Sequence, residues 1–119
     1  MTNNVYTTIT VPYIIDTNEL WSRIWGSNPG SFGSWWRGIE FVACDWNRIG
    51  GGMVHVTLED PDDDGAVIER SIVIDDIVAA LSDPSFPHHL RQNILDDNAD
   101  CVDSDAVIQK IVYGEIIFG

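Results

Sequence analysis

The sequence predicts one α+β domain: a three- to four-stranded, mostly antiparallel sheet with helices packed on one face and a helical C-terminal half. Two patterns lead to this prediction. Apolar residues alternate with period 2 over several runs before residue 75, and they recur with helical spacing after it. A length of 119 residues and an apolar content of 45% suffice for one core, so residues 1–119 form a single domain.

Four segments have the alternating pattern of strands, namely residues 5–15, 38–46, 53–58 and 66–74. Pro12 cannot donate a hydrogen bond to a neighbouring strand, so we expect the first strand at an edge or end of the sheet. A glycine-rich connection over residues 47–52 joins the second and third strands as a hairpin. It lacks the Lys-Ser/Thr that follows a phosphate-binding loop and leads into a strand instead of a helix.

Helices are predicted from capping residues and helical spacing. Asp16 or Thr17 caps a short helix that ends at Gly26, and Asp75 or Asp76 caps a second one. Pro87 suits the first position of a third helix that runs to Leu95.

The last predicted helix covers residues 105–113, with Ser104 as its cap and Gly114 as its stop. The tail over residues 115–119 is too apolar to hang free, so we expect it to pack against the core as a short strand or extended segment.

Charge divides the chain sharply. Residues 1–58 hold four acids and three bases, whereas residues 59–119 hold fifteen acids and three bases. Five of these acids fall in the turn between the third and fourth strands. A net charge of −13 argues against nucleic acid or anionic membrane as a direct ligand, because Lys and Arg bind their phosphates. The natural complement is a basic protein.

The candidate contact residues are ten carboxylates in the acidic half. They would stand in for phosphates on a basic surface, although acidity serving solubility alone explains the same composition. The ten are Glu59, Asp60, Asp62, Asp63, Asp64, Asp96, Asp97, Asp100, Asp103 and Asp105.

The turn also matches the opening of a calcium loop, in which Asp60, Asp62 and Asp64 alternate before Gly65. The match fails at the twelfth position, where Ser71 replaces the bidentate Glu. These three residues are therefore weak metal candidates beside the interpretation as a solvated hairpin loop.

Four of the five tryptophans lie within sixteen residues, in and before a loop rich in Gly and Ser. We expect this loop to fold onto the body as a buried aromatic cluster. The alternative is an exposed binding patch of Trp35, Trp36 and Arg37, because Trp and Arg dominate binding hot spots.

No motif marks an enzyme, a cofactor site or a zinc site, so we expect a protein without catalytic activity or cofactor. The N-terminus lacks the basic and apolar regions of a signal peptide, and no apolar run reaches the roughly 18 residues of a membrane span. We therefore expect a cytoplasmic protein whose Cys44 and Cys101 are free thiols. The oligomeric state stays open, with a homodimer as one option.

Four stretches, "TVPYIIDTNELWSRIWG", "WWRGIEF", "VTLEDPDDDG" and "DAVIQKIVYGEIIFG", resemble small acidic proteins of tailed actinobacterial phages, a family without an assigned function. The likeness spans most of the chain. It implies a viral protein that acts inside a bacterial host, and it carries over no binding residue.

Two functions compete. In the first, the protein is a non-enzymatic interaction protein that binds a basic surface of a host protein, including one that normally holds DNA; it would then act as a DNA mimic in anti-defence or host takeover. In the second, it is a small-molecule or calcium-binding module that uses the aromatic loop and the acidic turn.

Overall fold

The computed structural model describes residues 15–31, 33–44 and 52–118. The predicted first strand, apart from Ile15, lies outside the described residues, as does most of the glycine-rich connection.

Within these ranges, three strands form one antiparallel sheet in the order β1-β2-β3: β1 (Trp36–Cys44), β2 (Gly52–Glu59) and β3 (Val67–Ile72). Together with four α-helices, this confirms the predicted α+β class and its helical C-terminal half. The strands differ from the predicted ranges by about two residues at their ends. The central strand is β2, so β1 and β3 form the two edges of the described sheet.

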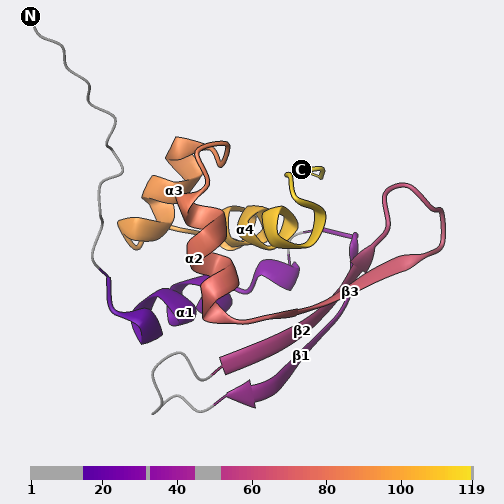
Figure 1. The fold of residues 1–119 in the computed structure, drawn as a ribbon, viewed down its shortest axis with the longest axis horizontal. Coiled ribbons are helices and arrows are strands. Elements are labelled where there is room, and N and C mark those ends of the chain that lie inside the picture. Colours follow the sequence, from indigo (N-terminus) through magenta and orange to yellow (C-terminus); the bar gives the residue numbers. More distant parts are fainter. Residues whose placement is uncertain (1–14, 32, 45–51, 119) are drawn as a thin grey trace, which may run out of the picture.

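Burial along β2 explains the two layers of the fold. Val54, Val56 and Leu58 are fully buried, whereas the residues between them are partly exposed. This alternation places one face of the sheet against the core and the other toward solvent. All the helices lie on the same side of the sheet in Figure 1.

The first helix, α1 (Thr17–Gly26), begins as predicted, because the side chain of Asp16 accepts a hydrogen bond from the backbone N–H of Glu19 at 3.0 Å. Its buried face is rich in tryptophan and aliphatic residues. A short 3-10 helix, η2 (Pro29–Ser31), follows and leads toward β1.

The next two helices are α2 (Ile74–Ser82) and α3 (His88–Leu95). The predicted cap of α2 was wrong: neither Asp75 nor Asp76 precedes the helix, which begins at Ile74. Asp76 instead reaches back from the first turn and accepts a hydrogen bond from the N–H of Val73 at 2.9 Å. Pro87 directly precedes α3 and does not occupy its first turn.

The last helix, α4 (Cys101–Tyr113), starts four residues before the predicted range. The carboxylate of Asp100 accepts hydrogen bonds from Val102 and Asp103, and Asp103 accepts one from Asp100 in return. This reciprocal cap overrides Ser104, which is buried inside the helix. The predicted stop is confirmed, because Gly114 ends the helix with a φ of +81°.

The C-terminal tail packs against α4 as an extended segment, one of the two predicted forms. The side chain of Gln109, which is fully buried, provides the attachment. Its Oε1 accepts hydrogen bonds from the N–H groups of Ile117 and Phe118, and its Nε2 donates to the carbonyl of Phe118 at 3.0 Å. One buried amide thus pairs with the tail backbone much as a neighbouring strand would.

Candidate functional site

The acidic turn forms a compact loop at the end of the β2–β3 hairpin. The backbone N–H of Asp60 donates to the carbonyl of Ala66 at 3.0 Å, and the N–H of Ala66 donates to the carbonyl of Asp63 at 2.9 Å. The side chain of Asp60 accepts from the N–H of Asp62 at 2.9 Å, and Gly65 has a φ of +84°. Backbone and side-chain hydrogen bonds therefore hold the loop in one conformation.

Asp60, Asp62, Asp63 and Asp64 form the acidic tip of the hairpin. The last three are exposed, and no cation within the described ranges forms an ion pair with any of the four. Figure 1 shows the β2–β3 loop at the right-hand end of the molecule, beyond the helices. The acidic tip is thus a projecting group of negative charges.

Glu59 lies at the base of the acidic tip and differs from it in its surroundings. Its carboxylate is 3.5 Å from the guanidinium of Arg37, and its carbonyl accepts a hydrogen bond from the hydroxyl of Tyr113 at 2.5 Å. Burial and the nearby carboxylates, first among them Glu59, raise the pKa of Tyr113 to about 12, so this hydroxyl keeps its proton at neutral pH. Glu59 therefore anchors the hairpin to α4.

The carboxylates of the α3–α4 junction lie elsewhere. Asp96, Asp97 and Asp100 are exposed. The α3–α4 junction to which they belong lies at the opposite end of the long axis from the β2–β3 loop in Figure 1. Asp96 accepts hydrogen bonds from Gln92, Asp97 lies 3.7 Å from Arg23, and Asp100 caps α4. The ten predicted contact residues do not form one continuous surface.

Two of the ten, Asp103 and Asp105, are buried, so they do not belong to an exposed contact surface. Asp103 completes the cap of α4. Asp105 accepts hydrogen bonds from the indole N–H groups of Trp35 (3.1 Å) and Trp36 (2.5 Å) and from the amide of Gln109 (2.6 Å). Burial raises the pKa of Asp105, while these three donors act in the opposite direction. Both carboxylates serve the fold.

The loop geometry gives the calcium hypothesis little support. Asp60 directs a carboxylate oxygen to the backbone of its own turn, whereas a calcium loop directs alternate side chains to one ion. Within the described ranges, no group of three His, Cys, Asp or Glu side chains is arranged to hold a metal ion.

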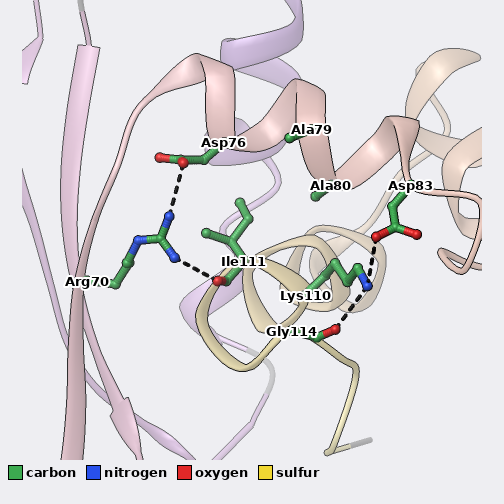
Figure 2. Close-up of a pocket in the computed structure, with 8 residues that line it drawn as sticks. All are labelled: Arg70, Asp76, Ala79, Ala80, Asp83, Lys110, Ile111 and Gly114. Carbon is green, nitrogen blue, oxygen red and sulfur yellow. Dashed lines mark hydrogen bonds and ion pairs between the residues drawn. The ribbon is translucent and has the colours of Figure 1, made fainter.

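A groove that the sequence did not predict lies between β3, α2 and α4, with a volume of about 360 Å³. Figure 2 shows that Arg70 enters it from β3 and Lys110 from α4. Arg70 pairs with Asp76 at 3.0 Å and donates to the carbonyl of Ile111 at 2.8 Å. Lys110 pairs with Asp83 at 3.1 Å and donates to the carbonyl of Gly114 at 2.9 Å.

Ion pairs and hydrogen bonds across the groove link β3, α2 and α4. Its two cations already contact carboxylates and carbonyls of the protein, so an incoming anion would have to displace those partners. The signal in the sequence was the position of Arg70, which stands between Ile68 and Ile72 on the apolar side of its strand. An inward-facing charge on an edge strand also discourages pairing with another chain.

The aromatic loop is attached to the body, as expected. Trp35 and Trp36 are half-buried, pack against the core and direct their indole N–H groups to Asp105. The ring of Trp35 stacks on Phe118 with centroids 5.0 Å apart, and Arg37 is exposed. The alternative patch therefore consists of two partly covered rings, Trp35 and Trp36, and of Arg37, which already pairs with Glu59.

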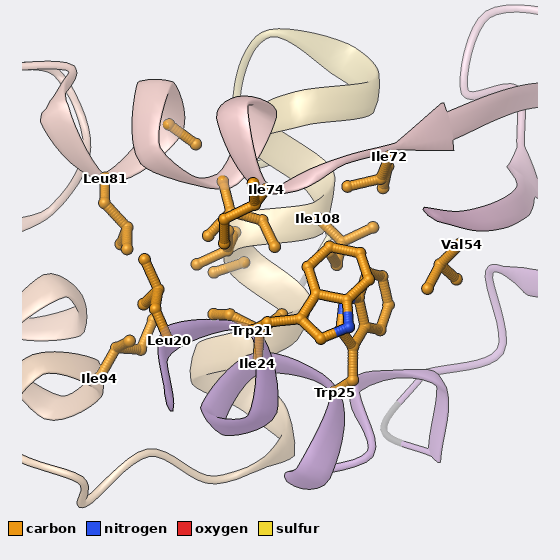
Figure 3. Packing of buried hydrophobic residues seen from close by; sticks show 14 of the residues in the cluster. Leu20, Trp21, Ile24, Trp25, Val54, Ile72, Ile74, Leu81, Ile94 and Ile108 are labelled. Carbon is orange, nitrogen blue, oxygen red and sulfur yellow. The ribbon is translucent and has the colours of Figure 1, made fainter. Parts of the chain in front are cut away.

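The other two described tryptophans belong to the core. Trp21 and Trp25 extend from α1 toward the strands, among the residues labelled in Figure 3. Their rings meet edge to face at 5.6 Å, and Trp25 meets Phe41 of β1 in the same way at 6.0 Å. Their buried indole N–H groups have no acceptor within the described part of the chain.

The outer face of the sheet carries a polar row that resembles part of a hydrolytic triad. One ring nitrogen of His55 lies 3.2 Å from the hydroxyl of Ser71, and the other lies 3.1 Å from the carboxylate of Glu69. The row is formed by cross-strand neighbours, because His55 pairs directly with Ser71. It stands on the solvated face, away from the groove, and provides no enclosure for a substrate.

Comparison with known proteins gives no identification. No family model, curated protein or solved structure matches the chain. None of the helices in the described ranges is both long enough and apolar enough to cross a membrane.

Proposed function

We propose that the protein is a non-enzymatic interaction protein whose acidic tip binds a basic surface of a partner protein. Its resemblance to actinobacterial phage proteins makes a protein of the bacterial host the expected partner. The proposal does not need the other carboxylates to take part in the same contact.

The observation that supports the proposal most is the combination of exposure and order at the acidic tip. Asp62, Asp63 and Asp64 are exposed and form no ion pair within the described ranges, so a partner would not have to break existing salt bridges. The hydrogen bonds of the turn already fix the backbone, which lowers the entropy lost on binding. A projecting loop also reaches into a concave basic surface more readily than a flat face does.

Electrostatics predict how such a contact would behave. Exposed carboxylates attract a basic partner over roughly the Debye length, about 8 Å at physiological salt, so association should slow as salt rises. Nucleic acid is not proposed as a ligand, because like charges repel.

A charge-reversal experiment tests the proposal. The full chain is immobilised as wild type, as Asp62→Lys/Asp63→Lys/Asp64→Lys, and as the control Glu40→Lys/Asp75→Lys/Asp96→Lys, which changes three exposed carboxylates away from the tip. Each is incubated with lysate of an actinobacterial host. The proteins captured are then quantified by mass spectrometry.

We expect a protein with a basic surface that wild type and the control retain and the tip variant loses. The two variants change net charge equally, so a general charge effect would reduce capture by both. Equal capture by all three, or loss with the control alone, would contradict the proposed role of the tip.

A further inference from the structure

The apolar packing of the β2–β3 hairpin ends just before the acidic tip. Leu58 is fully buried, whereas Val67, which pairs with the next residue Glu59, is 44% exposed. The loop beyond these residues projects past the helices in Figure 1. The hydrophobic core therefore fixes the hairpin as far as Leu58, and other contacts must hold the acidic tip in its orientation.

Glu59 supplies those contacts through each of its polar groups. Its backbone N–H donates to the carbonyl of Trp35 at 2.8 Å, and its carbonyl accepts from the hydroxyl of Tyr113 at 2.5 Å. Its carboxylate lies 3.5 Å from the guanidinium of Arg37, but both side chains are partly exposed, so solvent weakens this pair. Of the three partners, Tyr113 is the one that belongs to the helical layer. Its hydroxyl thus links the base of the acidic tip to α4.

The position of the Tyr113 ring is itself fixed by packing. Phe118 meets that ring edge to face at 6.0 Å and stacks on Trp35 with centroids 5.0 Å apart. The backbone N–H of Phe118 donates to the buried side chain of Gln109 at 2.7 Å. The hydroxyl of Tyr113 therefore keeps a defined position relative to Trp35, the other residue that contacts the backbone of Glu59.

We propose that Tyr113 is a positioning residue for the acidic tip: its hydroxyl, through the carbonyl of Glu59, holds the tip in the orientation that a basic partner surface contacts. This inference rests on the function proposed above. A partner binds only the fraction of molecules whose tip is correctly oriented, so loss of the hydroxyl weakens the apparent affinity by lowering that fraction. Because a single neutral hydrogen bond is lost, we expect the affinity to fall about threefold to tenfold.

The test compares the full chain as wild type, as Tyr113→Phe and as the control Ser85→Ala. Each variant lacks one hydroxyl and keeps the net charge, so electrostatic attraction of a basic partner is the same for all three. The hydroxyl of Ser85 donates to Asp83 at 2.7 Å and lies 3.0 Å from the ammonium of Lys110. Neither of these partners belongs to the hairpin.

Residual dipolar couplings, measured by NMR on the free protein, report the orientation of the acidic tip. In wild type and in Ser85→Ala, we expect the backbone couplings of the tip to fit the same alignment as those of β2 and α4. In Tyr113→Phe, the tip couplings should be reduced while those of β2 and α4 persist, because the loop then samples several orientations. Tip couplings that Tyr113→Phe leaves unchanged would overturn the proposal.

Affinity is measured for the basic protein that wild type captures from host lysate and the tip variant loses. Tyr113→Phe should bind it about threefold to tenfold more weakly than wild type, and Ser85→Ala should bind it equally well. A lower melting temperature of Tyr113→Phe with unchanged affinity would show a purely structural role and overturn the proposal. If wild type captures no such protein, the function proposed for the tip fails, and the couplings alone decide whether Tyr113 positions it.

Discussion

At the residue scale, Asp105 connects the aromatic loop, α4 and the C-terminal tail. Its carboxylate accepts from Trp35 and Trp36, and Gln109 links it to the tail backbone. Burying a carboxylate in its charged form lowers the stability of the fold, and hydrogen bonds offset that loss only in part. Because the pKa of Asp105 is raised, the stability of the fold depends on pH.

The folded protein holds the proton of Asp105 more tightly than the unfolded chain does, where the pKa is near 3.8. The stability that this proton gives is complete below that value and is lost as pH rises through the folded pKa. We expect the stability of wild type relative to Asp105→Asn to fall as pH rises above 3.8. Denaturant unfolding at several pH values measures it, and a constant or rising difference would contradict the prediction.

Asp83 should show the opposite dependence. The backbone N–H of Ser85, the Ser85 hydroxyl and Lys110 lower its pKa from 3.8 to about 2. The stability from its charge is present above pH 3.8 and is lost as pH falls through about 2. Asp83→Asn should therefore be less stable than wild type at neutral pH and should approach wild type as pH falls below about 2, as measured by thermal unfolding. Asp75→Asn, an exposed site on the same helix, is the control, and an unchanged gap at low pH would refute the assignment.

At the element scale, α4 is the central helix of the core. Val107 and Ile108 are fully buried, whereas Val102 on the first turn is 37% exposed. Ile108→Ala should lower the free energy of unfolding by about 2–5 kcal/mol because it leaves a cavity among packed side chains. The control, Val102→Ala, should cost within roughly 0.5 kcal/mol. Similar small effects at both sites, measured by denaturant unfolding, would show that the helix face is not core.

The β2–β3 loop gives an element-scale prediction about calcium. Because Asp60 caps its own turn and the other tip carboxylates are exposed, we expect millimolar calcium to leave the melting temperature unchanged. Thermal unfolding of wild type and Asp62→Ala, with and without calcium, checks it. A rise in wild type that the variant lacks would establish an ion site.

Periodicity predicted the elements well where the burial was simple, as in β2 and α1. It failed where two residues could cap the same helix. Ser104 was predicted as the cap of α4, but the helix is capped by Asp100, four residues earlier, together with Asp103. The packing of Ser104 and Asp105 into the core favours the longer helix.

At the scale of the whole molecule, composition predicted that the protein is acidic but not where its carboxylates lie in the structure. Among the predicted contact residues, the acidic tip and the carboxylates of the α3–α4 junction belong to segments at opposite ends of the long axis, and Asp103 and Asp105 are buried. Counting charges along the chain does not reveal this, because the sequence does not distinguish an Asp in a helix cap or beside an indole from an Asp in solvent. The groove escaped notice for a related reason: Lys110 is far in sequence from Arg70, Asp76 and Asp83, and it joins them only after α4 packs on α2.

The measurement that tests the central claim most directly is the affinity of the captured host partner for wild type, the tip variant and Trp35→Ala/Trp36→Ala across a salt series. We expect wild-type affinity to fall steeply between low and molar salt and the tip variant to bind weakly throughout. The tryptophan variant should lose stability, because its indoles hold Asp105 and the core, while its folded fraction still binds. A partner that stays bound at molar salt and is lost only with the tryptophans would contradict the account.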